Sequence, residues 1–305
     1  MMRRLAFIAR WMLVGVVVFA AMSGCSTVRM GYNQLDTIAL WTADRYFDLD
    51  DEQSRAFRTR FRRLHEWHRY EQLPDYANFL GEAKARLERG LTAEDVNWFI
   101  EGLQHRYEII VERGVDDAVA ILLTITPQQL VVLQTRWDKI NHNFASEYEI
   151  GSSIAQQRNA AAQRTIEICR DWFGSLSISQ EQMIRASVGQ MEMIGPLRQQ
   201  DRMRRQREFL ALMQLREKPD VFTEKLKYWL IHWQAGRSPE YQRAFALARE
   251  QRIALLIAID RTLTPHQRAL AAGRLQDYID DFRALSGHSS AHAAGAQQEP
   301  ISQKP

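Results

Sequence analysis

The sequence predicts an all-α fold, an elongated helical bundle built from two duplicated halves. Past residue 30, apolar residues recur every three or four positions, as on one face of a helix; Phe57, Phe61 and Leu64 are an example. The same region has no convincing alternation of apolar and polar residues and no Asn-Gly or Asp-Gly turn, so strands and hairpins are not expected. Four similar helix starts, described below, indicate the duplication.

Residues 1–24 have the pattern of a secretory signal. They contain Arg3, Arg4 and Arg10 but no Asp, Glu or Lys, and residues 11–21 are all apolar or glycine. This apolar run is shorter than the ~20 residues that a membrane-spanning helix requires. We therefore expect a cleaved signal peptide at 1–24.

The signal ends at Met22-Ser23-Gly24-Cys25, which resembles a bacterial lipobox. The resemblance implies a diacylglyceryl group on the Cys25 thiol, cleavage before this residue, palmitate among the acyl chains, and a lipidated tether over residues 25–32. Ser26 follows the cysteine where an Asp would retain a lipoprotein in the inner membrane, so the resemblance implies a periplasm-facing protein of the outer membrane. The alternative is an ordinary secretory signal in which Cys25 has no role.

The charge balance does not indicate nucleic-acid binding. The signal holds three of the 40 basic residues and no acidic one, so the chain from Cys25 onward has 37 basic and 37 acidic residues. The pI of 8.9 therefore reflects the signal segment. With Cys25 acylated, Cys169 has no cysteine partner in the chain, and no disulfide is expected.

Four helix starts share one pattern, an apolar residue followed by Asp, Thr or Ser and, three residues later, Gln. They are "LDDEQ" at 49–53, "ITPQQ" at 125–129, "ISQEQ" at 178–182 and "LTPHQ" at 263–267. The spacing predicts a capping box at Asp50/Gln53, Thr126/Gln129, Ser179/Gln182 and Thr264/Gln267. Pro127 and Pro265 would occupy the first helical position, where the missing N–H costs nothing.

Three of these helices carry an arginine seven residues after the glutamine: Arg60, Arg136 and Arg274. The start at Gln182 departs, with Gly189 at that place. Each arginine has a simple structural interpretation, a side chain that extends along an apolar stripe to water. Together they are candidate partner-binding residues.

Other landmarks recur in the same order and favour an ancient duplication. Pro74-Asp75 and a glycine at 90 precede "ITPQQ", and Pro219-Asp220 and a glycine at 236 precede "LTPHQ". We expect helical halves at 33–170 and 171–286. A disordered tail is expected at 287–305, where large apolar residues are few.

The stretch "YNQLDTIALWTADRYFDLDDEQ", residues 32–53, resembles the opening of an uncharacterised family of predicted proteobacterial lipoproteins. The resemblance extends over most of the mature chain and implies a helical envelope protein without an established activity. The four helix starts are also similar to the LTxxQ motif of small periplasmic chaperones of the spheroplast-protein-Y and CpxP type. That resemblance implies a concave surface for client polypeptides, framed here by Gln129, Gln267 and the three arginines.

The residues that carry chemistry elsewhere are mostly missing. His65 and His68 lack the "HExxH" spacing of a helical zinc protease, and the acidic stretch before Gln53 lacks the glycine of an EF-hand, so no metal or cofactor is expected. The basic run at 198–207 is interpreted chiefly as a solvated helix face, with acidic lipid headgroups as the alternative partner. The tryptophans at 229 and 233 are interpreted as core.

These patterns favour a non-catalytic envelope protein that binds unfolded polypeptide or envelope partners, in a chaperone-like or stress-response role. Two alternatives remain. One is a peptidoglycan enzyme of the helical lytic transglycosylase kind, although its Glu-Ser pair is absent from the chain. The other is a passive assembly scaffold. The positions of Arg136 and Arg274 separate binding from architecture: a shared open groove favours binding, and two buried ion-paired sites favour architecture.

Overall fold

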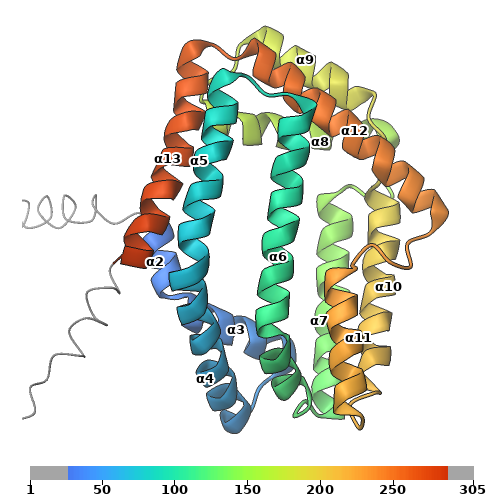
Figure 1. Ribbon diagram of the computed structural model, residues 1–305. Coiled ribbons are helices and arrows are strands. Elements are labelled where there is room, and N and C mark those ends of the chain that lie inside the picture. The colour runs from blue at the N-terminus through green and yellow to red at the C-terminus, as the bar shows by residue number, and fades with distance from the viewer. Residues whose placement is uncertain (1–26, 288–305) are drawn as a thin grey trace, which may run out of the picture.

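The computed structural model describes residues 27–287, and this part of the chain consists of helices without a strand (Figure 1). The prediction of an all-α fold is confirmed. The predicted signal, the lipidation site Cys25 and the tail after residue 287 lie outside the described residues.

The helices follow one another through short connections. They are α2 (Thr27–Asn33), α3 (Leu35–Phe47), α4 (Asp51–Trp67), a π-helical turn (His68–Gln72), α5 (Leu73–Arg89), α6 (Ala93–Leu122), α7 (Pro127–Glu147), α8 (Ile154–Phe173), α9 (Ile178–Gly189), α10 (Gly195–Met213), α11 (Pro219–Ile231), α12 (Pro239–Thr262) and α13 (Pro265–Gly287). The segment expected as a tether at 25–32 is therefore helical from Thr27 onward. The boundary expected after residue 170 falls inside α8.

The π-helical turn joins α4 and α5 into one long, irregular helix. Leu73 N–H donates to His68 O, five residues back, and Pro74 follows directly. Because Pro74 has no N–H and its ring crowds the preceding turn, a regular α-helix cannot continue through this position. The extra residue in the turn accommodates the proline and keeps the two helices nearly in line (Figure 1).

The helices form two four-helix groups with the same packing. In the first group α3 packs on α4 and α7, and α4 packs on α6. In the second group α8 packs on α9 and α13, and α9 packs on α12. In the first group, α5 lies between α4 and α6 in the chain. In the second group, α10 and α11 lie between α9 and α12.

These intervening helices cross to the other group. α5 packs along α13, and α10 and α11 pack on α7 and α6 (Figure 1). Leu87 of α5 is buried in the core of the second group, whereas Phe209, Met213, Phe222 and Leu226 of α10 and α11 are buried in the core of the first. Each group thus completes the core of the other, and the chain forms one interlocked body.

Three of the four predicted capping boxes are present as expected, those at Gln53, Gln129 and Gln267. The fourth prediction is wrong by two residues. The capping box is formed by Ser177 and Gln180, each two residues before the predicted Ser179 and Gln182. The apolar residue that leads the motif decides the register: Leu176 packs against the core, whereas Ile178 is 78% exposed.

The glutamines of these caps meet in two buried pairs. In the first pair, Gln53 Nε2 donates to Gln129 Oε1 at 3.1 Å, and Gln129 Nε2 donates to Gln53 Oε1 at 2.6 Å. The same amides also donate to backbone carbonyls, Gln53 to Thr124 O and Gln129 to Asp48 O, both at 2.9 Å. Each glutamine therefore caps its own helix and fastens the loop before the other.

The second pair repeats this geometry. Gln180 and Gln267 exchange Nε2–H···Oε1 bonds at 2.9 and 3.1 Å, and they donate to Thr262 O and Ser175 O. In all four cases the carbonyl belongs to the residue five positions before the partner glutamine. The two pairs hold α4 to α7 and α9 to α13 at their N-terminal ends.

The cap of α6 differs because it is built on a charge. The Asp95 carboxylate accepts hydrogen bonds from Arg86 and Arg89, both at 2.7 Å, and from the backbone N–H of Thr92 at 3.0 Å. Burial raises the pKa of Asp95, but the hydrogen bonds from Arg86 and Thr92 and the charge of Arg89 outweigh it and lower the pKa from 3.8 to about 2.

This lowered pKa predicts an acid-sensitive contribution to stability. Because the folded pKa of Asp95 lies below the unfolded value, its contribution is complete above the unfolded pKa near 3.8 and is lost as the pH falls through about 2. We expect the melting temperature of an Asp95→Asn variant to fall less than that of the wild type between these two values. Circular dichroism melts across this pH range measure the difference, and parallel curves would contradict the assignment.

Among residues 27–287, no single helix is both long and apolar enough to cross a membrane. Only the pair α6 and α7 passes such a test of length and composition jointly, and the two helices are bent by 119° where they meet.

Candidate functional site: the groove between α10 and α11

The residues that the sequence predicts as a partner-binding set do not come together. Gln129 and Gln267 are buried in separate glutamine pairs, where all their amide groups are used. Arg60 lies on α4 and forms an ion pair with Asp117 of α6 at 2.9 Å. The structure gives these three side chains architectural contacts.

The other two arginines occupy different helix groups. Arg136 lies half-buried on α7, in a pocket of about 280 Å³ that it shares with Trp41, Arg45 and Lys139. Arg274 is exposed on α13. The pocket that holds Arg136 does not include Arg274, so the two arginines do not frame a shared groove there.

A larger groove, of about 860 Å³, lies between α10 and α11. Its lining consists of apolar and aromatic side chains with charges of both signs at the rim: Arg205, Glu208, Ala211, Leu212, Leu215, Glu224, Lys225, Tyr228, Trp229, His232, Ala235 and Gly236. The volume falls within the range of pockets that bind ligands or side-chain clusters. This α10–α11 groove is the candidate site.

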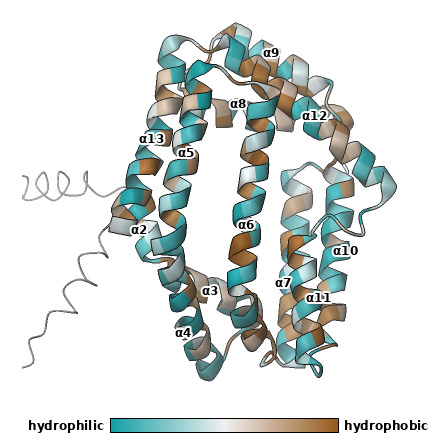
Figure 2. Ribbon diagram, viewed as in Figure 1, coloured by the Kyte–Doolittle hydropathy of each residue, from teal (hydrophilic) through white to brown (hydrophobic). Residues whose placement is uncertain are grey.

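The periodicity of α10 and α11 explains why a groove forms between them. Phe209 and Met213 on α10, and Phe222 and Leu226 on α11, turn one face of each helix into the core shared with α7. Figure 2 shows these apolar segments where α11 lies beside α7 and α10. The neighbouring faces are left to form the walls of the groove, and Tyr228 on α11 is exposed there.

Arg205 fixes the end of α11 beside the groove. Its guanidinium donates to Trp229 O and Trp233 O, all at 3.2 Å, and lies 4.1 Å from the centre of the Trp229 ring. The carbonyls at a helix C-terminus lack intrahelical partners and carry partial negative charge. A guanidinium there donates hydrogen bonds to these carbonyls and its positive charge stabilises the helix end. Burial lowers the pKa of Arg205, and the charge of Glu208 opposes this shift.

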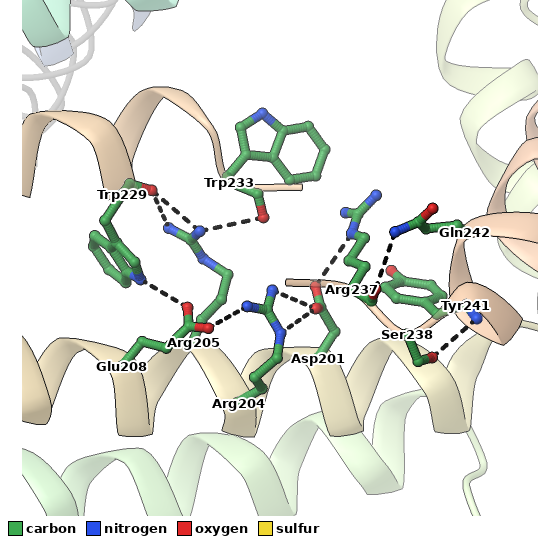
Figure 3. A network of polar contacts seen from close by, with 10 residues as sticks. All are labelled: Asp201, Arg204, Arg205, Glu208, Trp229, Trp233, Arg237, Ser238, Tyr241 and Gln242. Atoms are coloured by element: carbon green, nitrogen blue, oxygen red, sulfur yellow. Dashed lines mark hydrogen bonds and ion pairs between the residues drawn. The ribbon is translucent and has the colours of Figure 1, made fainter. Parts of the chain in front are cut away.

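A second set of ion pairs lies along α10, and one of them, between Asp201 and Arg237, reaches the loop after α11 (Figure 3). Arg204 donates from Nε and Nη2 to Asp201 Oδ1 at 2.9 and 2.6 Å, and its Nη1 bonds Glu208. Arg237 contacts Asp201 Oδ2 at 3.4 Å, and Glu208 Oε2 accepts from the Trp229 indole at 3.2 Å. The carboxylate of Asp201 thus serves two arginines, and Glu208 links Arg204 to the aromatic wall.

Arg237 is enclosed by aromatic rings. Its guanidinium lies 4.6 Å from the ring centres of Trp233 and Phe245 and 4.7 Å from that of Tyr241. Such contacts stabilise a cation that has left water. With only 3% of its side chain exposed, Arg237 anchors the loop between α11 and α12.

Gly236 allows this loop to pass close to α10. Its φ is +76°, and an added Cβ would lie 2.6 Å from Arg204 Nη1. A Gly236→Ala variant should therefore lose about 1–2 kcal/mol of unfolding free energy, from the left-handed backbone and the displaced guanidinium. The control is Gly189→Ala on α9, where no atom lies within 4 Å of the added Cβ and where alanine should stabilise the helix slightly. Urea unfolding of both variants measures the contrast, and equal effects would contradict it.

The two walls of this site come from segments that are each distinctive in the sequence but lie apart in the chain. The basic run at 198–207 supplies Arg204 and Arg205, and the run that contains Trp229 and Trp233 supplies the facing wall. The interpretation of the basic run as a solvated face is wrong for these two arginines, since both are partly buried and paired. No signal within either segment shows that they face each other.

The two histidines singled out in the sequence are in a different place. Tyr32 O–H and His68 Nδ1 share a hydrogen bond of 2.8 Å, and the Tyr32 ring lies 4.6 Å from that of His65. Burial, assisted by His65, lowers the pKa of His68 to about 4. In the described part of the chain, no cluster of three or more His, Cys, Asp or Glu side chains has an arrangement that fits a metal ion.

A comparison with family models finds one match, to a family of unknown function, DUF6279, over residues 45–242. The chain belongs to this family. The match confirms the coarser part of the resemblance noted in the sequence, membership of an uncharacterised family. All ten residues drawn in Figure 3 lie within the span that matches DUF6279. No curated protein and no solved structure matches the chain.

Proposed function

We propose that this DUF6279 protein is a non-catalytic helical lipoprotein, tethered to the outer membrane through Cys25, that binds apolar segments of polypeptide in the α10–α11 groove. The observation that carries the proposal is the groove itself, an open, mainly apolar groove of about 860 Å³. Its two walls are joined by hydrogen bonds of Arg205 and Glu208 to α11 and its C-terminal loop. The periplasmic location rests on the signal and lipobox patterns of residues 1–25.

The chemistry of the groove suits a polypeptide with apolar side chains. Leu212 and Leu215 offer an aliphatic floor, and Tyr228 and Trp229 offer flat rings that bury much area with little loss of rotamer entropy. Glu224 and Lys225 at the rim can pair with charges of either sign on a bound chain. An apolar groove with few polar groups places few sequence requirements on a bound chain, which suits a chaperone-like role.

The wall residues also explain why we propose binding in preference to cleavage of a glycan. A lytic transglycosylase requires a carboxylic acid that donates a proton from an apolar cleft. The Glu208 carboxylate instead accepts hydrogen bonds from Arg204 and from the Trp229 indole, so its contacts favour the role of an acceptor.

We also propose that the two helix groups arose by duplication. The support is the repeated glutamine pair, with the same donors and the same five-residue spacing to the accepted carbonyls, and the matching contacts of α3 and α8 with their neighbours. The α10–α11 segment has no counterpart of equal length in the first group, where α5 alone occupies that place. The proposed binding groove lies on this longer insertion.

The proposal is tested by light scattering from a denatured protein that aggregates on dilution, with the chain from Ser26 onward added at increasing molar ratio. We expect suppression of scattering by the wild type and its loss in an Ala211→Glu variant, because the new carboxylate enters the groove from an exposed position on α10. Ala186→Glu on α9 is the matched control, since Ala186 is exposed and lines no part of the groove.

A double variant with Arg136→Ala and Arg274→Ala tests the earlier sequence-based hypothesis in the same assay. It should suppress scattering like the wild type if the groove is the binding surface. Loss of suppression in this double variant, with full suppression by Ala211→Glu, would overturn the assignment to the groove.

A further inference from the structure

Helices α2 and α3 expose one continuous stripe of side chains. Gln34, between α2 and α3, donates its N–H to Met30 O and accepts from Ile38 N–H, so the helical hydrogen bonding continues through the break. Thr27, Met30, Gln34, Thr37, Ile38, Trp41, Thr42 and Arg45 are all exposed and recur at the spacing of a single helix face. We refer to these eight residues as the N-terminal stripe.

The composition of the N-terminal stripe is unusual for a water-facing helix. Three of its members are large and apolar, and Met30, Ile38 and Trp41 are 57%, 46% and 59% exposed. It contains no acidic residue; Asp44 lies at its edge, where its carboxylate accepts from Leu49 N–H. A contiguous row of exposed apolar side chains is typical of a surface that contacts another protein or a membrane.

Basic residues border the stripe on one side. The Arg45 guanidinium lies 5.1 Å from the Trp41 ring centre, and both side chains line a pocket with Arg136 and Lys139 of α7. Tryptophan and long basic side chains beside aliphatic ones are the combination found where a helix lies in a membrane interface, the rings at headgroup level and the cations on anionic headgroups.

The stripe is held rigidly to the body. Arg29 of α2 donates to Asp281 of α13 at 2.6 Å, and Asn33 accepts from Arg69 at 2.8 Å. α2 begins two residues after Cys25. A lipid on that cysteine would therefore bring the N-terminal stripe to the membrane with almost no linker between them.

We propose that the N-terminal stripe lies on the phospholipid surface of the membrane that anchors the chain, with Met30, Ile38 and Trp41 in the interface and Arg45, Arg136 and Lys139 on anionic headgroups. This inference rests on the lipid tether of the proposed function and adds an orientation: α3 faces the membrane, and the body projects from it on the far side.

The test uses the full chain, processed by its host and reconstituted into vesicles of phosphatidylethanolamine and phosphatidylglycerol that contain brominated lipid as a quencher. A fluorophore is attached at Ile38→Cys or, as the matched control, at the exposed Ile178→Cys on α9; Cys169 is buried. A probe at position 38 within ~5–10 Å of the headgroup boundary should be quenched at least about twofold more than one at 178. Arg136→Glu with Lys139→Glu should reduce this quenching, and the same charge change at two exposed arginines outside the groove, Arg207→Glu with Arg243→Glu, should not.

Equal quenching at positions 38 and 178 would overturn the orientation, whatever the state of Cys25. The tether is assessed separately by the mass of the peptide that contains Cys25. An unmodified peptide would refute the lipid anchor of the proposed function, and quenching at 38 in that same sample would still support the N-terminal stripe as the membrane-facing surface.

Discussion

A Gln129→Ala variant should lose about 2–4 kcal/mol of unfolding free energy, because the truncation leaves one buried amide and two partly buried backbone groups without partners. Those groups are the backbone N–H of Thr126, the carbonyl of Asp48 and the amide of Gln53, each within 3.1 Å of the Gln129 amide. Gln129 is one of the two glutamines that fasten the N-terminal ends of α4 and α7 to each other. Urea unfolding followed by circular dichroism measures the loss.

Gln156→Ala is the matched control for this prediction. Gln156 forms a capping box with Ser153 at the start of α8, but it is exposed and has no glutamine partner. Its replacement should cost about 1 kcal/mol or less, the usual worth of a cap. A cycle with Gln53→Ala should show a coupling energy of about 1–3 kcal/mol between Gln53 and Gln129. Equal losses for Gln129→Ala and Gln156→Ala would contradict the importance of the buried pair.

An Asp201→Ala variant should lose about 3–5 kcal/mol, the range found when one partner of a buried ion pair is removed. The Asp201 side chain is 10% exposed, and its carboxylate is the anion for Arg204 and for Arg237, which is almost fully buried. Without it, two cations lie close together with one carboxylate, that of Glu208, beside them. We expect the loop after α11 to detach and the groove to lose one of its walls.

Asp117→Ala provides the comparison. Asp117 also accepts from two arginines, Arg60 and Arg63, but 36% and 60% of their side chains are exposed. Ion pairs of this kind contribute about 0–1 kcal/mol. Chemical unfolding of both variants separates buried from exposed pairing, and a small loss for Asp201→Ala would show that the network is not a wall of the groove in solution.

Local sequence signals predict the helix starts of this fold well. A capping box depends on residues three positions apart, so Thr126 with Gln129 and Thr264 with Gln267 can be identified without knowledge of the rest. The error at Ser179 shows the limit of this information. Two overlapping candidates have the correct spacing there, and burial of Leu176 and Gln180 against distant helices selects one of them.

The candidate site depends on contacts that no local pattern encodes. The members of a glutamine pair are 76 or 87 residues apart, and the groove forms only where residues 205–215 meet residues 224–236. The sequence of a basic run does not show whether its side chains face water or the C-terminus of another helix. The role of Arg205 as a cap for α11 is therefore a property of tertiary packing, as is the exchange of α5 and α10–α11 between the two helix groups.

The most direct test of the central claim is the affinity of the groove for an apolar polypeptide. It is measured as the fluorescence anisotropy of a labelled, unstructured peptide rich in leucine and phenylalanine, titrated with the chain from Ser26 onward. We predict saturable binding by the wild type and by Ala186→Glu, and a Kd at least about tenfold weaker for Ala211→Glu, equivalent to about 1.4 kcal/mol. The same Kd for both variants at unchanged melting temperature would contradict binding in the α10–α11 groove.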